Sequence, residues 1–147
     1  LQSAAFLSPY YDTSWLHHPH VHGGEVCGGI VSGLIGPHAP EASRWETLWH
    51  YMQGGPGVFR GDLHFYKGEG DLRPKLARID TKRCPVHMLT GNYDYSCKPE
   101  DTEATTAAIP GAKVQIMNGL GHFPMSEDYA ALRPYLLPVL AEFQERG

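Results

Sequence analysis

Two stretches decide the fold of this chain: residues 86–94, VHMLTGNYD, and residues 113–124, KVQIMNGLGHFP. Each begins with a short apolar or alternating run and continues into a glycine-containing turn, which is typical of a strand followed by a loop. A strand is therefore expected in the first part of each stretch. The loops that follow hold one carboxylate, Asp94, and one imidazole, His122.

Helical patterns follow both strands. A helix is expected over 99–109, because Pro99 suits the first helical position. Another is expected from Ser126 as its N-cap, and Pro134 and Pro138 predict a restart or a kink within it. The order strand, helix, strand, helix predicts an α/β fold with parallel strands joined by right-handed crossovers and covered by helices.

The part before residue 84 has a different, mostly helical pattern. Ser43 and Glu46 have the spacing of a capping box at the start of a tryptophan-containing helix, and glycines line one face of the helix before it. These patterns predict two regions, residues 1–83 and residues 84–147. The helices expected in the first region cover 26–36, 43–52 and, more weakly, 72–79.

Composition excludes several classes of partner. The net charge is −4 and there is no block of Lys or Arg, so neither nucleic acid nor an anionic membrane surface is expected to bind. The longest uncharged apolar stretch, 26–36, is far shorter than the roughly 20 residues of a membrane span. The three cysteines are scattered, which favours reduced thiols and a cytoplasmic protein without a metal or other cofactor. A start at Leu1, without Met, indicates a processed or truncated chain.

The two loops are where chemistry is expected. Open α/β sheets place their active sites beyond the carboxyl ends of the strands, and both loops follow such ends. A carboxylate there can accept the N–H of an imidazole and fix its tautomer, which prepares the ring to act as a general base. Asp94 and His122 are therefore the candidate catalytic residues.

This arrangement resembles the C-terminal part of the α/β-hydrolases over about residues 84–146. The resemblance implies that Asp94 and His122 are the acid and base of a catalytic triad and that residues 1–83 are a cap. It implies a small or medium apolar ester, thioester, lactone or activated C–C bond as substrate, or an epoxide or haloalkane if the nucleophile were Asp. The nucleophile and first strands would lie upstream of Leu1, on the N-terminal half of the same protein or on a second copy.

The chain departs from the family pattern at the nucleophile, because no G-x-S-x-G occurs. In the nearest match, residues 29–33, the serine stands one place late and falls in a helical stripe, so Ser32 is not expected to be the nucleophile. Cys97 follows Asp94 too closely on the same loop to serve instead. The alternative is therefore a hydrolase-like module that binds a ligand or partner without catalysis.

Several aromatic and ionisable residues have two interpretations. Tyr95 and Phe123 adjoin the candidate pair and are predicted to contact substrate. Metal binding by the histidine-rich residues 17–22 is disfavoured, because no Cys, Asp or Glu stands at ligand spacing. Glu127 is expected to be a helix first-turn charge. Five aromatic residues could line a substrate pocket, with burial in the core the favoured alternative: Trp45, Trp49, Phe59, Phe65 and Tyr66.

Overall fold

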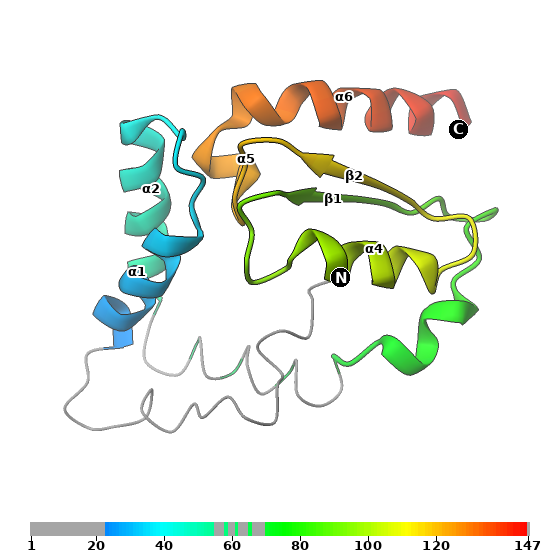
Figure 1. Cartoon of the computed structure of the whole chain (residues 1–147), viewed down its shortest axis with the longest axis horizontal. Helices are drawn as coiled ribbons and strands as arrows, with labels where there is room; N and C mark the ends of the chain where they lie inside the picture. Colours follow the sequence, from blue (N-terminus) through cyan, green and yellow to red (C-terminus); the bar gives the residue numbers. More distant parts are fainter. Residues whose placement is uncertain (1–22, 55–57, 59–60, 62–64, 66–69, 147) are drawn as a thin grey trace.

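The computed structural model describes residues 23–54, 58, 61, 65 and 70–146 (Figure 1). The histidine-rich residues 17–22, together with Phe59 and Tyr66, lie outside this described part. Among the described residues, no helix combines the length and apolar character that crossing a bilayer requires.

Two parallel strands form the sheet of the described part. Strand β1 (His87–Gly91) pairs with β2 (Lys113–Met117) in a register that places the first residues of the two strands opposite each other. Helix α4 (Pro99–Ala107) connects them, and α6 (Tyr129–Arg146) follows β2. Figure 1 shows α4 and α6 on opposite sides of the strand pair, and the predicted α/β class is confirmed.

The region after β2 differs from the expectation in its helix boundaries. A short helix, α5 (Pro124–Glu127), precedes α6, and Asp128 rather than Ser126 caps α6 by accepting the N–H of Ala131 at 2.9 Å. The hydroxyl of Ser126 instead contacts the Phe123 carbonyl oxygen within α5. The Ser126 cap was therefore a wrong prediction.

Helix α6 also continues through both of its prolines, where a restart or a kink was predicted, and it does not restart. Pro134 and Pro138 lie on the exposed side, whereas Leu132 and Val139 are buried beneath the same helix. Burial of an apolar stripe stabilises a helix more than the loss of single backbone hydrogen bonds destabilises it. Tertiary packing therefore accounts for the unbroken helix.

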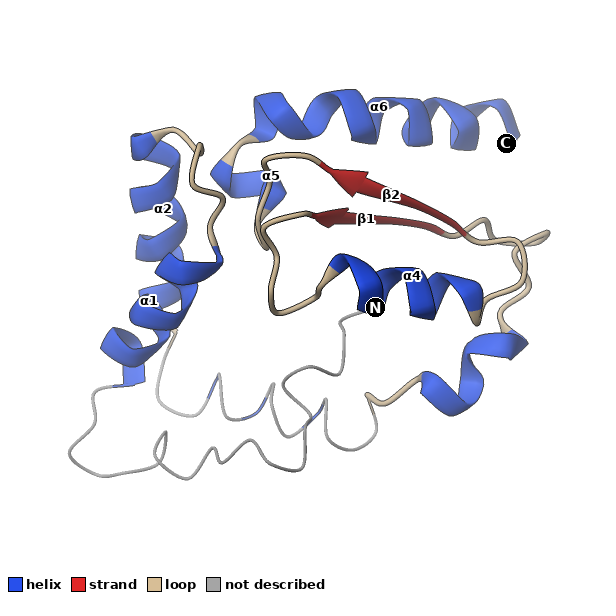
Figure 2. Ribbon diagram, viewed as in Figure 1, coloured by secondary structure: helices blue, strands red, loops and turns tan. Residues whose placement is uncertain are grey.

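Two helices come first among the described elements. Helix α1 (Gly23–Leu34) and helix α2 (Glu41–Met52) pack against each other beside the loop end of the sheet, and Figure 2 shows both as blue ribbons next to α5. The capping box is wrong: α2 begins at Glu41 after an extended Pro40, with no side-chain cap, so Ser43 already lies inside the helix. The weakly predicted helix at 72–79 is a 3₁₀ helix, η3 (Arg73–Arg78).

Apolar side chains gather in two clusters that support the two loop ends. One cluster joins α1 to the loop after β2, and the other joins β2 to α6. The first consists of Val31, Leu34, Ile35 and Phe123, and the second of Met117, Leu120 and Leu132. The loop after β2 contributes to both clusters, so packing fixes it from two sides.

Candidate active site

The structure brings the two candidate catalytic residues together. Asp94 Oδ2 lies 2.8 Å from His122 Nδ1, a hydrogen bond between residues 28 positions apart. The Asp94 side chain is 6% exposed and that of His122 is 14% exposed. A short, largely buried contact of this kind orients the imidazole and favours the tautomer with its proton on Nδ1.

The acid loop, residues 92–97, holds the Asp94 carboxylate with its own backbone. Oδ1 accepts the N–H of Ser96 at 2.9 Å and the N–H of Cys97 at 2.8 Å. Thr90, at the end of β1, donates its hydroxyl to the Cys97 carbonyl oxygen at 2.9 Å. Oδ1 of Asp94 therefore holds the loop, and Oδ2 is hydrogen-bonded to His122.

The histidine loop, residues 118–123, is held by the end of helix α1. The His122 N–H donates to the Leu34 carbonyl oxygen at 2.9 Å. Gly121 lies so close to the Leu34 carbonyl and the Gly36 backbone that a side chain at this position would collide with both. The loop requires glycine there because two backbones approach each other.

Glu127 completes this arrangement: it lies in the first turn of α5, as expected, but it has a further role that the sequence did not predict. Its side chain is fully buried, and its two oxygens accept the N–H groups of Gly121 and Phe123, the latter at 3.3 Å. These are the two neighbours of His122, so Glu127 holds the histidine loop in addition to being a charge in the first turn of α5. No sequence pattern revealed this, because α5 is only one turn long and shows no helical period.

Direct hydrogen bonds also join the two loops. Asn92 Oδ1 accepts the N–H of Gly119 at 2.8 Å, and its Nδ2 donates to Asn118 Oδ1 at 2.9 Å. The Tyr93 N–H donates to the Leu120 carbonyl oxygen at 3.0 Å. The separation of Asp94 and His122 is therefore set by contacts on both loops.

The surroundings of His122 change its proton affinity. Burial of the ring disfavours the imidazolium, but hydrogen bonds to Asp94 and Cys97 and the charges of these groups outweigh it, raising the pKa of His122 from 6.5 to about 9. The rings of Phe123 and His122 are nearly perpendicular, with their centres 4.8 Å apart. The arrangement favours a charged imidazole that an adjacent carboxylate stabilises.

Ser32 has the environment that the sequence predicted. It lies in α1, and its hydroxyl donates to the Gly29 carbonyl oxygen of the same helix at 2.8 Å. A nucleophile elbow is instead a sharp turn between a strand and a helix. The geometry at Ser32 gives no reason to assign it a catalytic role.

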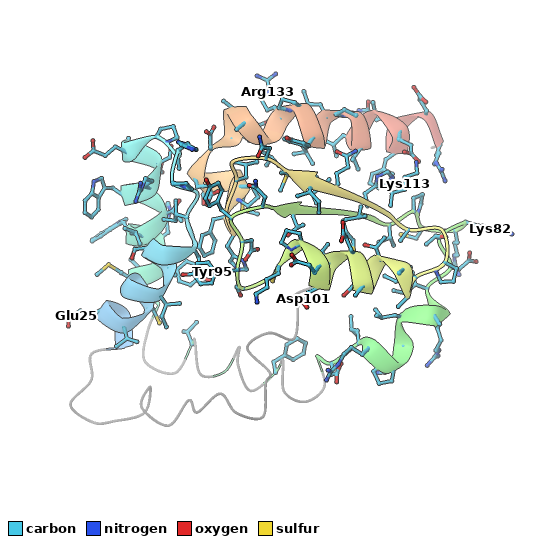
Figure 3. The ribbon with its side chains drawn as sticks, in the orientation of Figure 1. Glu25, Lys82, Tyr95, Asp101, Lys113 and Arg133 are labelled. Atoms are coloured by element: carbon cyan, nitrogen blue, oxygen red, sulfur yellow. The ribbon has the colours of Figure 1, made fainter. Side chains whose placement is uncertain are left out.

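The predicted aromatic contacts occupy different environments. Tyr95 is 53% exposed, its hydroxyl lies against Gly33, and Figure 3 shows it between α1 and the loop from β1 to α4. Phe123 is 9% exposed and belongs to the cluster beneath α1. Trp45 and Trp49 are each 65% exposed on α2, so the favoured core interpretation is wrong for both of them. Phe65 is also exposed.

Comparisons with known proteins agree with this fold. No protein-family model and no curated protein sequence matches the chain. Among solved structures, the chain is similar to a thermophilic esterase from Thermogutta terrifontis (TM-score 0.67, 17% identity, 88% of this chain and 47% of that one). It is also similar to a bromoperoxidase from Bacillus anthracis (TM-score 0.66, 19% identity, 87% and 46%).

A third similar structure is Est816, described as an N-acyl homoserine lactone degrading enzyme (TM-score 0.59, 18% identity, 85% of this chain and 49% of that one). These neighbours are α/β-hydrolases, and the described fold is the α/β-hydrolase fold over the part that matches. The chain spans a little under half the length of these three structures.

Proposed function

We propose that the chain carries the acid and base of an α/β-hydrolase, with Asp94 orienting His122. The substrate is a small or medium apolar ester, thioester, lactone or activated C–C bond, and the nucleophile belongs to an upstream N-terminal half or a second copy. The observation that carries this proposal is the buried 2.8 Å contact between Asp94 Oδ2 and His122 Nδ1, at the loop ends of two parallel strands.

The geometry suggests how the pair would work. With Nδ1–H donated to Asp94, Nε2 of His122 carries the lone pair and can accept the proton of a nucleophilic hydroxyl. The nucleophile then attacks the carbonyl carbon of the substrate, and the imidazolium returns its proton to the leaving group. Asp94 stays ionised throughout and stabilises the imidazolium.

The rest of the chain has proposed roles in the same enzyme. Residues 1–83 form a cap-like region and residues 84–147 the C-terminal part of the core, and packing of α1 and α2 beside the histidine loop supports this division. Four aromatic residues are proposed to contact substrate: Trp45, Trp49, Tyr95 and Phe123. Cys27, Cys84 and Cys97 form no disulfide, which supports a cytoplasmic location, where disulfides are rare.

Hydrolysis of a p-nitrophenyl ester by the complete protein tests the proposal. The His122→Ala variant is expected to lose on the order of 10³-fold or more in turnover, because a triad base is removed. His50→Ala, at an exposed position on α2, is the matched control and should retain wild-type turnover. Activity of His122→Ala within tenfold of wild type would show that the assignment is wrong.

The alternative is a hydrolase-like module that binds without catalysis. It is favoured by one observation: within the described residues, the sheet has only two strands, so each strand has an edge that can recruit another chain. A complete protein that hydrolyses no ester and in which no upstream nucleophile elbow occurs would support this alternative.

A further inference from the structure

A third side chain of metal-ligand type lies beside the Asp94–His122 pair. Cys97 is hydrogen-bonded to His122, and one ligand atom from each of Asp94, Cys97 and His122 lies within 4.8 Å of the others. Asp94 is buried, whereas Cys97 and His122 are partly exposed. A carboxylate, a thiol and an imidazole therefore meet at one place that solvent can reach.

This set of donors selects a particular class of ion. Zinc binds Cys sulfur, His nitrogen and carboxylate oxygen, commonly with three protein ligands and a solvent molecule in the fourth position. Magnesium and calcium prefer oxygen ligands throughout. We propose that Asp94, Cys97 and His122 bind a divalent cation of the zinc class, and that the ion inhibits the enzyme by occupying its acid–base pair.

Small movements would bring the three ligand atoms to a tetrahedral ion. Around a tetrahedral zinc ion, two ligand atoms lie roughly 3.3–3.6 Å apart. The distance of 2.8 Å between Asp94 Oδ2 and His122 Nδ1 would therefore lengthen, and ligand-atom distances of up to 4.8 Å within the cluster would shorten. Each change is on the order of 1 Å, which side-chain rotation supplies. Oδ1 of Asp94 remains on the Ser96 and Cys97 N–H groups, so the loop need not refold.

The same atoms then serve two exclusive purposes. In the absence of metal, the Asp94 carboxylate orients the imidazole, and with metal bound both groups are ligands and His122 no longer accepts a proton from a nucleophile. The inhibition rests on the proposed hydrolase function, whereas metal binding does not. Binding and inhibition can therefore fail separately.

Cobalt titration of the full chain tests binding without any activity assay. A thiolate ligand gives cobalt a charge-transfer band in the near ultraviolet, and we expect this band to saturate at one ion per chain. Cys97→Ser should lose the band and bind zinc on the order of tenfold or more weakly. The matched control is Cys84→Ser, because Cys84 is exposed and lies outside the cluster.

Further variants and measurements make the result decisive. Three results would overturn the proposed site. The wild type could show no charge-transfer band, or the band could survive in Cys97→Ser. The third result is loss of the band in a His20→Ala/His22→Ala variant. If Cys97→Ser does not fold, X-ray absorption of the zinc-loaded wild type decides, since a first coordination shell without sulfur also overturns it. Zinc that binds at Cys97 in a protein without esterase activity supports the site and contradicts only the hydrolase proposal.

Discussion

The acid loop and the histidine loop reach the same site by different means. In the acid loop, Asp94 accepts two N–H groups from residues two and three positions later, and Thr90 supports the same turn. In the histidine loop, the supporting groups come from Leu34 of α1 and from the buried Glu127. The Asp94 carboxylate is thus held mainly by the backbone of its own loop, whereas the histidine loop is held by Glu127, which follows it closely, and by the distant Leu34 of α1.

The largest expected effect comes from the residue that joins the two loops. Asp94→Asn keeps the shape of the side chain but removes its charge, so His122 is no longer held in one tautomer. Turnover of an ester by the complete protein should fall by on the order of 10³-fold or more, as for loss of the acid in other triads. Asp101→Asn, on α4, is the matched control. Equal losses in both variants would contradict a specific role for Asp94.

Glu127 offers the sharpest test of the histidine loop. Glu127→Gln replaces one acceptor oxygen with an amide nitrogen, so one of the Gly121 and Phe123 N–H groups loses its partner. The free energy of unfolding should fall by about 1.5–3 kcal/mol, the usual value for a hydrogen bond to a charged group. Urea denaturation measures the change, with the exposed Glu103→Gln as control.

A positioning role also predicts a kinetic result that stability alone does not. Glu127 touches no proposed reacting group, so in folded Glu127→Gln the turnover number should fall while the KM changes little. Wild-type turnover in the folded variant would mean that Glu127 stabilises the loop without positioning His122.

The pH dependence tests the contact between the loops. The folded-state pKa of His122 is raised from 6.5 to about 9. A raised pKa means that the stabilisation is fully present below about pH 6.5 and is lost as the pH rises through about 9. The difference in Tm between wild type and His122→Ala should therefore shrink over this range, while turnover rises because only neutral imidazole accepts a proton. A Tm difference that is constant from about pH 6 to about pH 10 would contradict the raised pKa.

The contrast between the loops also explains what the sequence could predict. The two strands, their loops and the Asp94–His122 pair follow from short-range patterns, namely apolar runs, turn residues and the position of loops in an α/β sheet. The buried role of Glu127 and the contact from Leu34 to His122 depend on surfaces that meet only in the folded chain. A periodic pattern in the sequence cannot predict such contacts.

The same reasoning accounts for the errors in the first region. Trp45 and Trp49 are spaced with a helical period, and the predicted helix is present. The period does not show whether another part of the protein packs on these side chains, and both are exposed. Ser43 fits a capping box, yet Pro40 starts the helix earlier because its backbone angle is already restricted. Element type was predictable from local sequence, whereas exposure and the first residue of the helix were not.

The smallest expected effects come from two threonine hydroxyls, one that supports a loop locally and one that joins two helices. Thr90→Val removes the hydroxyl that supports the acid loop, and Thr47→Val removes the one that links α2 to Ser126 of α5 at 3.0 Å. Each should lower the free energy of unfolding by about 1 kcal/mol. Because the acid loop keeps its other local hydrogen bonds, amide exchange in Thr90→Val should quicken only near residues 92–97. In Thr47→Val, exchange should quicken in both α2 and α5, since that bond joins separate elements. The same local pattern in both variants would show that the Thr47–Ser126 bond does not couple α2 to α5.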